Sequence, residues 1–160
     1  MKTNFMHPVI AVAALFAIAG PLSRSRAAEP EVMTMRNSNL KLTVGAHVLT
    51  AALENNASSR DFVSLLPLTL TLRDYASTEK ISDLPKRLST QGAPEGSVPR
   101  IGDVAYYAPW GNLAIFHKKD FKYSSGLIKI AHLAGDIAAL TTDGPVTVRI
   151  ELATLDRAPR

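Results

Sequence analysis

The side chains best suited to contact another molecule gather between Gly102 and Gly126. This segment contains the only tryptophan of the chain, three of its four tyrosines and two of its five phenylalanines. Tryptophan and tyrosine combine a large apolar ring with a polar tip, which is frequent at binding surfaces. The composition of the segment therefore favours recognition of a ligand as its chemistry.

The segment predicts two strands that meet at a Pro-Trp-Gly-Asn turn, followed by an aromatic and basic loop over residues 118–125. Asn112 would add directional hydrogen bonds, Phe121 a further ring and Lys122 a positive rim. Aromatic residues that alternate on strands are equally typical of a core, so Tyr106, Trp110 and Phe116 are alternatively core residues. The turn favours the site, because binding residues concentrate on loops. The candidate ligand-binding residues are Tyr107, Trp110, Asn112, Phe116 and Tyr123.

No spacing in the chain is typical of a metal site or a catalytic centre. His47, His117 and His132 each lack a second histidine two to four residues away, and the chain has no cysteine. There is no G-x-S-x-G or S-x-x-K motif with its supporting residues, and no pair of carboxylates stands out. The glycines between Gly92 and Gly96 lack the spacing of a phosphate loop. We therefore expect no metal, no cofactor and no catalytic residues.

The first 27 residues have the plan of a secretory signal. Lys2 precedes an apolar run from Val9 to Gly20, and small residues follow at Ser25 and Ala27. The run is shorter than the ~20 residues of a membrane-spanning helix. We expect cleavage after Ala27, with Ala28 as the neighbouring option, and a periplasmic or secreted protein that does not associate with membranes after cleavage.

The charge balance argues against a nucleic-acid partner once this segment is removed. The whole chain has 18 basic and 14 acidic residues. Loss of Lys2, Arg24 and Arg26 leaves 15 basic residues against 14 acidic ones, a net charge of +1. Nucleic-acid binding needs a basic surface on the folded domain, and the basic excess here belongs to the signal.

The mature chain divides into a flexible lead-in over 28–38, one domain over 39–153 and a tail over 154–160. Without cysteines the domain must be held together by core burial. Strict alternation of apolar and polar residues predicts strands at 68–73 and 146–152. Less regular alternation predicts a hairpin, 40–44 with 48–53, and a strand over 127–133.

Helices are predicted only as short elements. Ser58 and Asp61 resemble a capping box before an apolar face formed by Phe62 and Leu65, and Pro67 ends that helix. A second short helix is expected over 136–140. Residues 76–100 contain three prolines and two glycines and are expected to form a loop with one helical turn near Ile81–Leu84.

About seven short strands without long connecting helices favour a closed antiparallel barrel or a sandwich. Four stretches sharpen this expectation, since in this order and spacing they resemble the bacterial cyclophilin-like domain family over about Leu40 to Glu151. They are Phe62–Tyr75, Glu79–Thr90, Gly92–Gly96 and Gly102–Asn112, with LPLTL, GAPEG and YYAPWGN as the most specific strings. The resemblance implies a mainly β protein, a closed barrel of about eight mostly antiparallel strands with two short helices.

The resemblance also implies peptidyl-prolyl isomerisation as an activity, but the family's catalytic arginine in a Phe-His-Arg motif is replaced in the string Phe116-His117-Lys118. A lysine ammonium does not reproduce the planar donor fork of arginine. The leading expectation is therefore an exported binding module for a small molecule or a peptide segment. An isomerase acting on exported proteins and a structural partner in an envelope complex are the alternatives.

Overall fold

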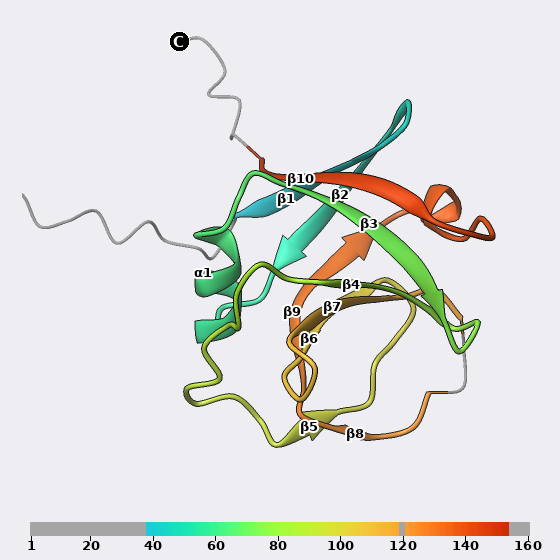
Figure 1. Cartoon of the computed structure of the whole chain (residues 1–160). Coiled ribbons are helices and arrows are strands. Elements are labelled where there is room, and N and C mark those ends of the chain that lie inside the picture. The colour runs from blue at the N-terminus through green and yellow to red at the C-terminus, as the bar shows by residue number, and fades with distance from the viewer. Residues whose placement is uncertain (1–37, 119–120, 154–160) are drawn as a thin grey trace, which may run out of the picture. The chain divides into compact units, whose positions relative to one another are not determined.

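The computed structural model describes residues 38–118 and 121–153, which form a closed barrel of eight antiparallel strands (Figure 1). The barrel follows the order β1-β10-β3-β4-β7-β6-β9-β2. Its strands are β1 (Asn39–Val44), β2 (His47–Leu53), β3 (Leu68–Tyr75), β4 (Glu79–Asp83), β6 (Asp103–Tyr107), β7 (Asn112–Phe116), β9 (Leu127–Ala134) and β10 (Val146–Leu152). The predicted signal, most of the lead-in and the tail lie outside the described residues, as do 119–120.

Alternate residues of these strands point inward and make a single core. This agrees with the alternation in the sequence, because successive side chains of a strand point to opposite faces. The predicted hairpin is confirmed, with a turn at Gly45, whose φ of +57° suits glycine. The inward side chains include Leu40, Leu42, Leu70, Leu72, Val104, Tyr106, Leu113, Ile115, Val148 and Ile150, all buried.

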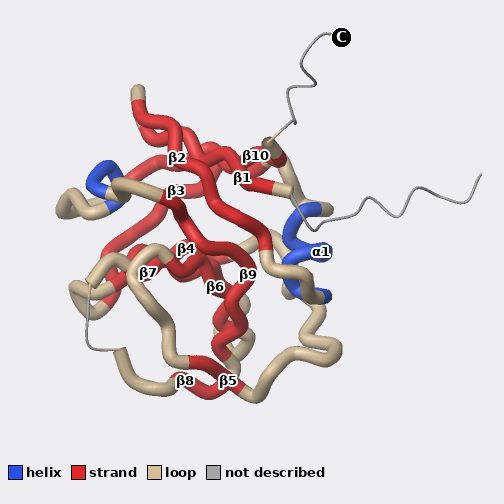
Figure 2. The backbone as a smooth tube through the Cα atoms, turned by 180° about the vertical axis from the view of Figure 1, so that it is seen from behind, coloured by secondary structure: helices blue, strands red, loops and turns tan. Residues whose placement is uncertain are grey.

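Two short helices lie on opposite sides of the barrel in both views (Figures 1 and 2). The α-helix α1 (Ala57–Val63) places Phe62 in the core, and the 3-10 helix η2 (Ala138–Leu140) does the same with Leu140. The second of these is the predicted short helix, reduced to one turn. No helix in the described part of the chain is long and apolar enough to cross a membrane.

The predicted capping box of α1 is wrong. Asn56 is the N-cap, and its Oδ1 accepts the N–H of Ser59 at 2.8 Å. Ser58 instead donates from Oγ to Ser89 O at 2.6 Å, and Asp61 Oδ2 accepts the N–H of Ser89 at 2.8 Å. The two polar residues therefore fasten the helix to a distant segment of the chain.

The loop predicted over 76–100 is wrong in two places. Residues Glu79–Asp83, expected to include a helical turn, form the barrel strand β4, and Gly96–Ser97 form the short strand β5. The sequence signal fails in β4 because its inward positions are the polar residues Lys80 and Ser82, whereas the apolar Ile81 points outward. Strand β3 likewise extends to Tyr75, two residues beyond the predicted end.

Lys80 is an inward charge whose side chain is fully buried. Its ammonium donates to Thr142 O at 2.6 Å, to Gly144 O at 2.7 Å and to Asp74 Oδ1 at 2.6 Å. An ammonium has three donors, so all of them are satisfied. The Lys80 ammonium, together with the Gly144 N–H that donates to Asp74 Oδ2, holds the pKa of Asp74 below its usual value. Lys80 therefore ties the β3–β4 hairpin to the segment that precedes β10.

A second, two-stranded sheet stands apart from the barrel wall. Strand β5 pairs antiparallel with β8 (Ser124–Ser125), and the two lie side by side in Figures 1 and 2. Gly96 is required here, since a Cβ at this position would overlap the carbonyl oxygen of Ser124 and come within 2.8 Å of Ser125 Cα. This β5–β8 ribbon fixes the chain on either side of it, and both sides contribute to the site described next.

Candidate functional site

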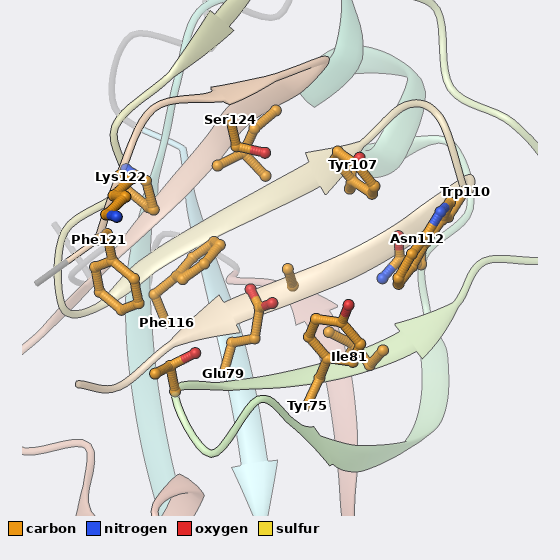
Figure 3. A pocket seen from close by; sticks show the side chains of 14 residues that line it. Tyr75, Glu79, Ile81, Tyr107, Trp110, Asn112, Phe116, Phe121, Lys122 and Ser124 are labelled. Atoms are coloured by element: carbon orange, nitrogen blue, oxygen red, sulfur yellow. The ribbon is translucent and has the colours of Figure 1, made fainter. Parts of the chain in front are cut away.

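A cavity of about 220 Å³ lies on the outside of the barrel wall, over β4, β7 and β6 (Figure 3). Its volume corresponds to roughly seven water molecules at ~30 Å³ each, which is the size of a small organic molecule or one side chain. Fourteen residues line it: Tyr75, Thr78, Glu79, Ile81, Pro99, Tyr107, Trp110, Asn112, Ala114, Phe116, Phe121, Lys122, Ser124 and Leu127.

The floor of the cavity is made by outward side chains of adjacent strands. Ile81 of β4 pairs with Ala114 of β7, and Ala114 pairs in turn with Ala105 of β6. The short side chain of Ala114 leaves the wall low at its centre, whereas Phe116 and Leu127 have larger side chains around it and pack into the same outer cluster. The hollow therefore follows from side-chain size on a regular sheet.

Three aromatic rings make one wall. The ring of Trp110 meets those of Tyr75 and Tyr107 edge-to-face, each at a centroid distance of 5.4 Å. Trp110 is 54% exposed, which rules out the alternative that it fills the core, whereas Tyr106 does fill it. Edge-to-face contacts of this kind stabilise ring positions beyond their buried area. The wall is thus held in place by its own rings.

The turn that carries Trp110 is fixed by contacts on both sides. Arg87 Nη1 donates to Ala108 O at 2.7 Å, and the N–H of Ala108 donates to Gly126 O at 2.9 Å. Gly126 has a φ of +77°, and a Cβ there would come within 2.7 Å of Pro109 Cδ. The aromatic turn therefore packs directly on the chain between β8 and β9.

A second aromatic pair closes the other end of the cavity, and the chain leading into β8 supplies its upper edge. Phe116 and Phe121 meet edge-to-face at 4.9 Å. Lys122, exposed at the rim, and Ser124, half-buried, follow Phe121. Figure 3 shows these residues at the end of the cavity opposite Trp110 and Asn112. The cavity is therefore elongated between two aromatic groups.

Glu79 supplies the carboxyl group among the described residues that line the cavity. It is half-buried on β4, and in Figure 3 its carboxyl group lies between Phe116 and Tyr75. Burial raises the pKa of this carboxyl to about 7, because desolvation disfavours the charged form. Among the described residues no hydrogen bond or ion pair compensates the carboxyl. Glu79 therefore exchanges a proton near neutral pH.

Asn112 is the buried hydrogen-bonding group of the cavity, with only 2% of its surface exposed. Its Nδ2 makes one long contact, 3.5 Å, to Leu113 O. Its Oδ1 is buried and has no hydrogen-bond partner among the described residues. Buried polar atoms are nearly always paired, so an unpaired acceptor in a cavity wall is a feature that calls for a partner.

The structure brings together four of the five predicted site residues. Tyr107, Trp110, Asn112 and Phe116 line the cavity, as do Phe121 and Lys122. Tyr123 does not: its ring is 58% exposed, and its hydroxyl packs near Gly96 of the β5–β8 ribbon. In the Phe116-His117-Lys118 string only Phe116 lines the cavity, and His117 follows the end of β7.

Sequence reasoning missed the contributions of β3 and β4. Tyr75 and Glu79 stood where a strand end and a loop were expected, so nothing placed them beside the aromatic segment. A signal was present in the apolar Ile81 between two polar neighbours, since that pattern also fits a strand whose apolar side faces outward.

The three described histidines lie apart from one another and from the cavity. His47 is exposed, and the buried Nε2 of His117 has no partner among the described residues. His132 Nδ1 lies 2.8 Å from Asp103 Oδ1, which Lys129 also approaches at 3.2 Å. No group of three potential metal ligands occurs within residues 38–118 and 121–153.

Comparison with known proteins identifies the fold. A model of the Cyclophilin-like family matches residues 42–151, which confirms the resemblance found in the sequence motifs. The solution structure of a hypothetical protein from Archaeoglobus fulgidus is similar to this chain, with a TM-score of 0.55 and 17% sequence identity. That similarity covers 74% of this chain and 96% of the other. A search of curated proteins finds no match.

Proposed function

The chain belongs to the Cyclophilin-like family, and within this fold we propose that it is a binding module whose outer-wall cavity holds a small molecule or one segment of a peptide, without catalysing a reaction. The proposal is carried by the cavity itself, which is walled by the rings of Tyr75, Tyr107 and Trp110 and has the carboxyl group of Glu79 in its lining. Asn112 adds a buried amide oxygen that has no partner among the described residues.

The remaining lining supports the same function. Most of the wall is apolar or aromatic, and a few polar groups stand at defined places, which is the usual make-up of a small-molecule site. The walls are fixed by strand pairing, by ring contacts and by the Arg87 contacts to the turn. A preformed site loses little conformational entropy when a ligand binds.

The test is a fragment screen by NMR on the ¹⁵N-labelled full chain. Trp110 is the only tryptophan, so its indole N–H gives a single signal that reports on the cavity. We expect a subset of fragments, drawn equally from cationic, anionic and neutral compounds, to shift this signal together with the amides of Asn112 and Ala114. Absence of any such fragment would overturn the proposal.

Catalysis of prolyl isomerisation is the alternative that the family resemblance raised. The cavity lining contains no arginine, and its one basic side chain is Lys122 at the rim. We expect no acceleration of proline isomerisation in a protease-coupled peptide assay at micromolar protein. A measurable, concentration-dependent acceleration would replace the binding function by the enzymatic one.

We also propose that the protein acts in the periplasm or outside the cell, supported by the charged start, short apolar run and small residues of 1–27. N-terminal sequencing of the protein purified from its producing cells should begin at Ala28, or at Glu29 if cleavage follows the neighbouring alanine. A sequence that still begins at Met1 would contradict this location.

A further inference from the structure

We propose that the cavity selects a ligand with a cationic nitrogen group, an amidinium, guanidinium or ammonium, which binds at the carboxylate of Glu79. The inference rests on the proposed binding function and names the chemical class of its ligand. The ligand is either a free small amine or amidine, or the side chain of an arginine or lysine in a peptide.

The hydrogen-bonding groups of the lining favour a ligand that donates. Asn112 Oδ1 and the Glu79 carboxylate are both acceptors without partners among the described residues. The hydroxyl groups of Tyr75, Thr78 and Ser124 can accept as well as donate. Charge-assisted hydrogen bonds to a carboxylate are about twice as strong as neutral ones, so Glu79 gives the largest gain to a cationic donor.

The aromatic rings favour a cation over a neutral donor. In Figure 3 the Glu79 carboxyl lies next to Tyr75 and Phe116, and Trp110 extends the same wall beyond Tyr75. A cation near the face of such a ring is attracted by its quadrupole, and the attraction grows when water is excluded. The apolar part of a ligand would meanwhile contact Ile81 and Ala114 on the floor.

The charges around the site do not cancel this preference. Lys122 is the cation at the cavity, and it is exposed at the rim, where water and salt screen it. Lys80 lies on the inward face of β4 and is already paired with Asp74. His117 follows the end of β7 and is not among the residues that line the cavity. Tyr75 and Tyr107 are the other titratable groups of the lining.

The raised pKa of Glu79 adds a measurable signature. A cation binds the ionised carboxyl, so binding displaces the proton that Glu79 holds at and below pH 7. About nine-tenths of the carboxyl groups are ionised at pH 8 and about one-tenth at pH 6. The affinity for a cation should therefore fall about tenfold between pH 8 and pH 6, whereas the affinity for a neutral ligand should not fall.

The experiment compares benzamidinium with benzamide and benzoate, which share a ring and differ in charge. Binding to the full chain is measured at pH 8 and pH 6 by the Trp110 indole shift and by calorimetry. We expect benzamidinium to bind at least tenfold more tightly than benzamide at pH 8. Glu79→Gln should abolish both this preference and its pH dependence. Glu54→Gln removes a carboxylate paired with Lys129 away from the cavity and should leave both intact.

A second arm distinguishes the two sources of the cation. N-acetyl-arginine N-methylamide, with its citrulline analogue as the neutral control, represents a peptide side chain. Tight binding of the arginine derivative assigns the site to peptides, and binding of benzamidinium alone assigns it to a free small molecule.

The outcomes separate this inference from the function on which it rests. Equal binding of benzamide and benzamidinium, no binding of benzamidinium, or a preference that survives Glu79→Gln would each overturn the cationic ligand. If neutral or anionic fragments still bind at Trp110 in the screen, the binding function stands with another ligand class. If no fragment binds, both the binding function and the cationic ligand class are overturned.

Discussion

Glu79 and Lys80 are neighbours on β4 that point to opposite faces of the barrel wall, and the protein treats their charges differently. Lys80 is fully buried in the barrel, and each of its three donors meets an oxygen atom. Glu79 is half-buried outside, uncompensated among the described residues, and its carboxyl has a pKa of about 7. The buried charge of Lys80 supports the fold, whereas the carboxyl group of Glu79 remains without a partner at the cavity.

The same division runs through β7. Leu113 and Ile115 belong to the core, whereas Asn112, Ala114 and Phe116 face the cavity. Stability and binding are therefore assigned to alternating positions of the same strands. Substitutions at inward positions should change the free energy of unfolding, and substitutions at outward positions should change ligand affinity. Four experiments test this separation.

The largest effect is expected at Lys80. Lys80→Met keeps the length of the side chain but removes the ammonium that joins Asp74 to two carbonyl groups. The Asp74 side chain is 39% exposed, so the main cost comes from the two carbonyl oxygens that lose their buried donor, and we expect a loss of about 3 kcal/mol in the free energy of unfolding. Urea denaturation measures it. Lys41→Met, at an exposed ion pair of the same barrel, is the matched control and should change little.

Trp110 and Tyr123 test which aromatic residues form the site. Trp110→Ala removes the ring that contacts both Tyr75 and Tyr107, and we expect at least a tenfold loss of affinity for benzamidinium, about 1.4 kcal/mol. Tyr123→Ala should leave that affinity unchanged, because Tyr123 is outside the cavity lining. Calorimetric titration of both variants measures the two affinities. An equal loss of affinity in both variants would extend the site to the β5–β8 ribbon.

Glu79→Gln should alter the pH dependence of stability. The folded protein keeps the Glu79 carboxyl protonated up to about pH 7, against an ordinary pKa of 4.5. The stability that goes with this proton is therefore fully present below pH 4.5 and is lost as the pH rises to about 7. Glutamine has no proton to lose. The variant should gain about 1 kcal/mol at pH 8, a value reduced for the solvent that reaches the carboxyl, and nothing at pH 4.

The difference between the two proteins, measured by urea denaturation from pH 4 to pH 8, isolates this effect. Burial lowers the pKa of His117 below 6.5, and the resulting change of stability has the opposite sign but is common to both proteins. A constant difference across the pH range would show that Glu79 is not desolvated.

The smallest effect on stability is expected at Asn112. Asn112→Ala removes an unpaired buried acceptor together with some packing, so the free energy of unfolding should change by less than about 0.5 kcal/mol. Leu113→Ala, one residue away on the inward face, should cost about 3 kcal/mol. Thermal and urea unfolding compare the pair. Similar losses in both would contradict the separation of the two faces.

The fold was predictable where a strand has one apolar and one polar face. Leu68–Arg73 and Val146–Leu152 were recognised because their leucines, valines and isoleucine point into the core. Strand β4 was not, because a paired lysine occupies its inward face. Periodicity reports the polarity of side chains, and it cannot show that the polar ones are satisfied by groups distant in the sequence.

The site was predictable as far as one continuous segment supplies it. The Pro-Trp-Gly-Asn turn predicted Trp110 and Asn112 for the site, and both line the cavity, because a turn at this point fixes which residues of the two strands share a face. Tyr75 and Glu79 reach the cavity only through the pairing of β4 with β7, which no local pattern specifies. Tyr123 lies outside the lining, and its hydroxyl is near Gly96 of the β5–β8 ribbon.

The pairing of Ile81 with Ala114 and Ala105 across three strands also has a consequence for redesign. Because Ile81 and Ala114 line the cavity and belong to the outer cluster, the depth of the cavity depends on the sizes of these two side chains. Enlarging Ala114 to valine or leucine would make the cavity shallower, and reducing Ile81 to alanine would make it deeper. A library over these positions would offer one barrel with a graded series of cavity volumes.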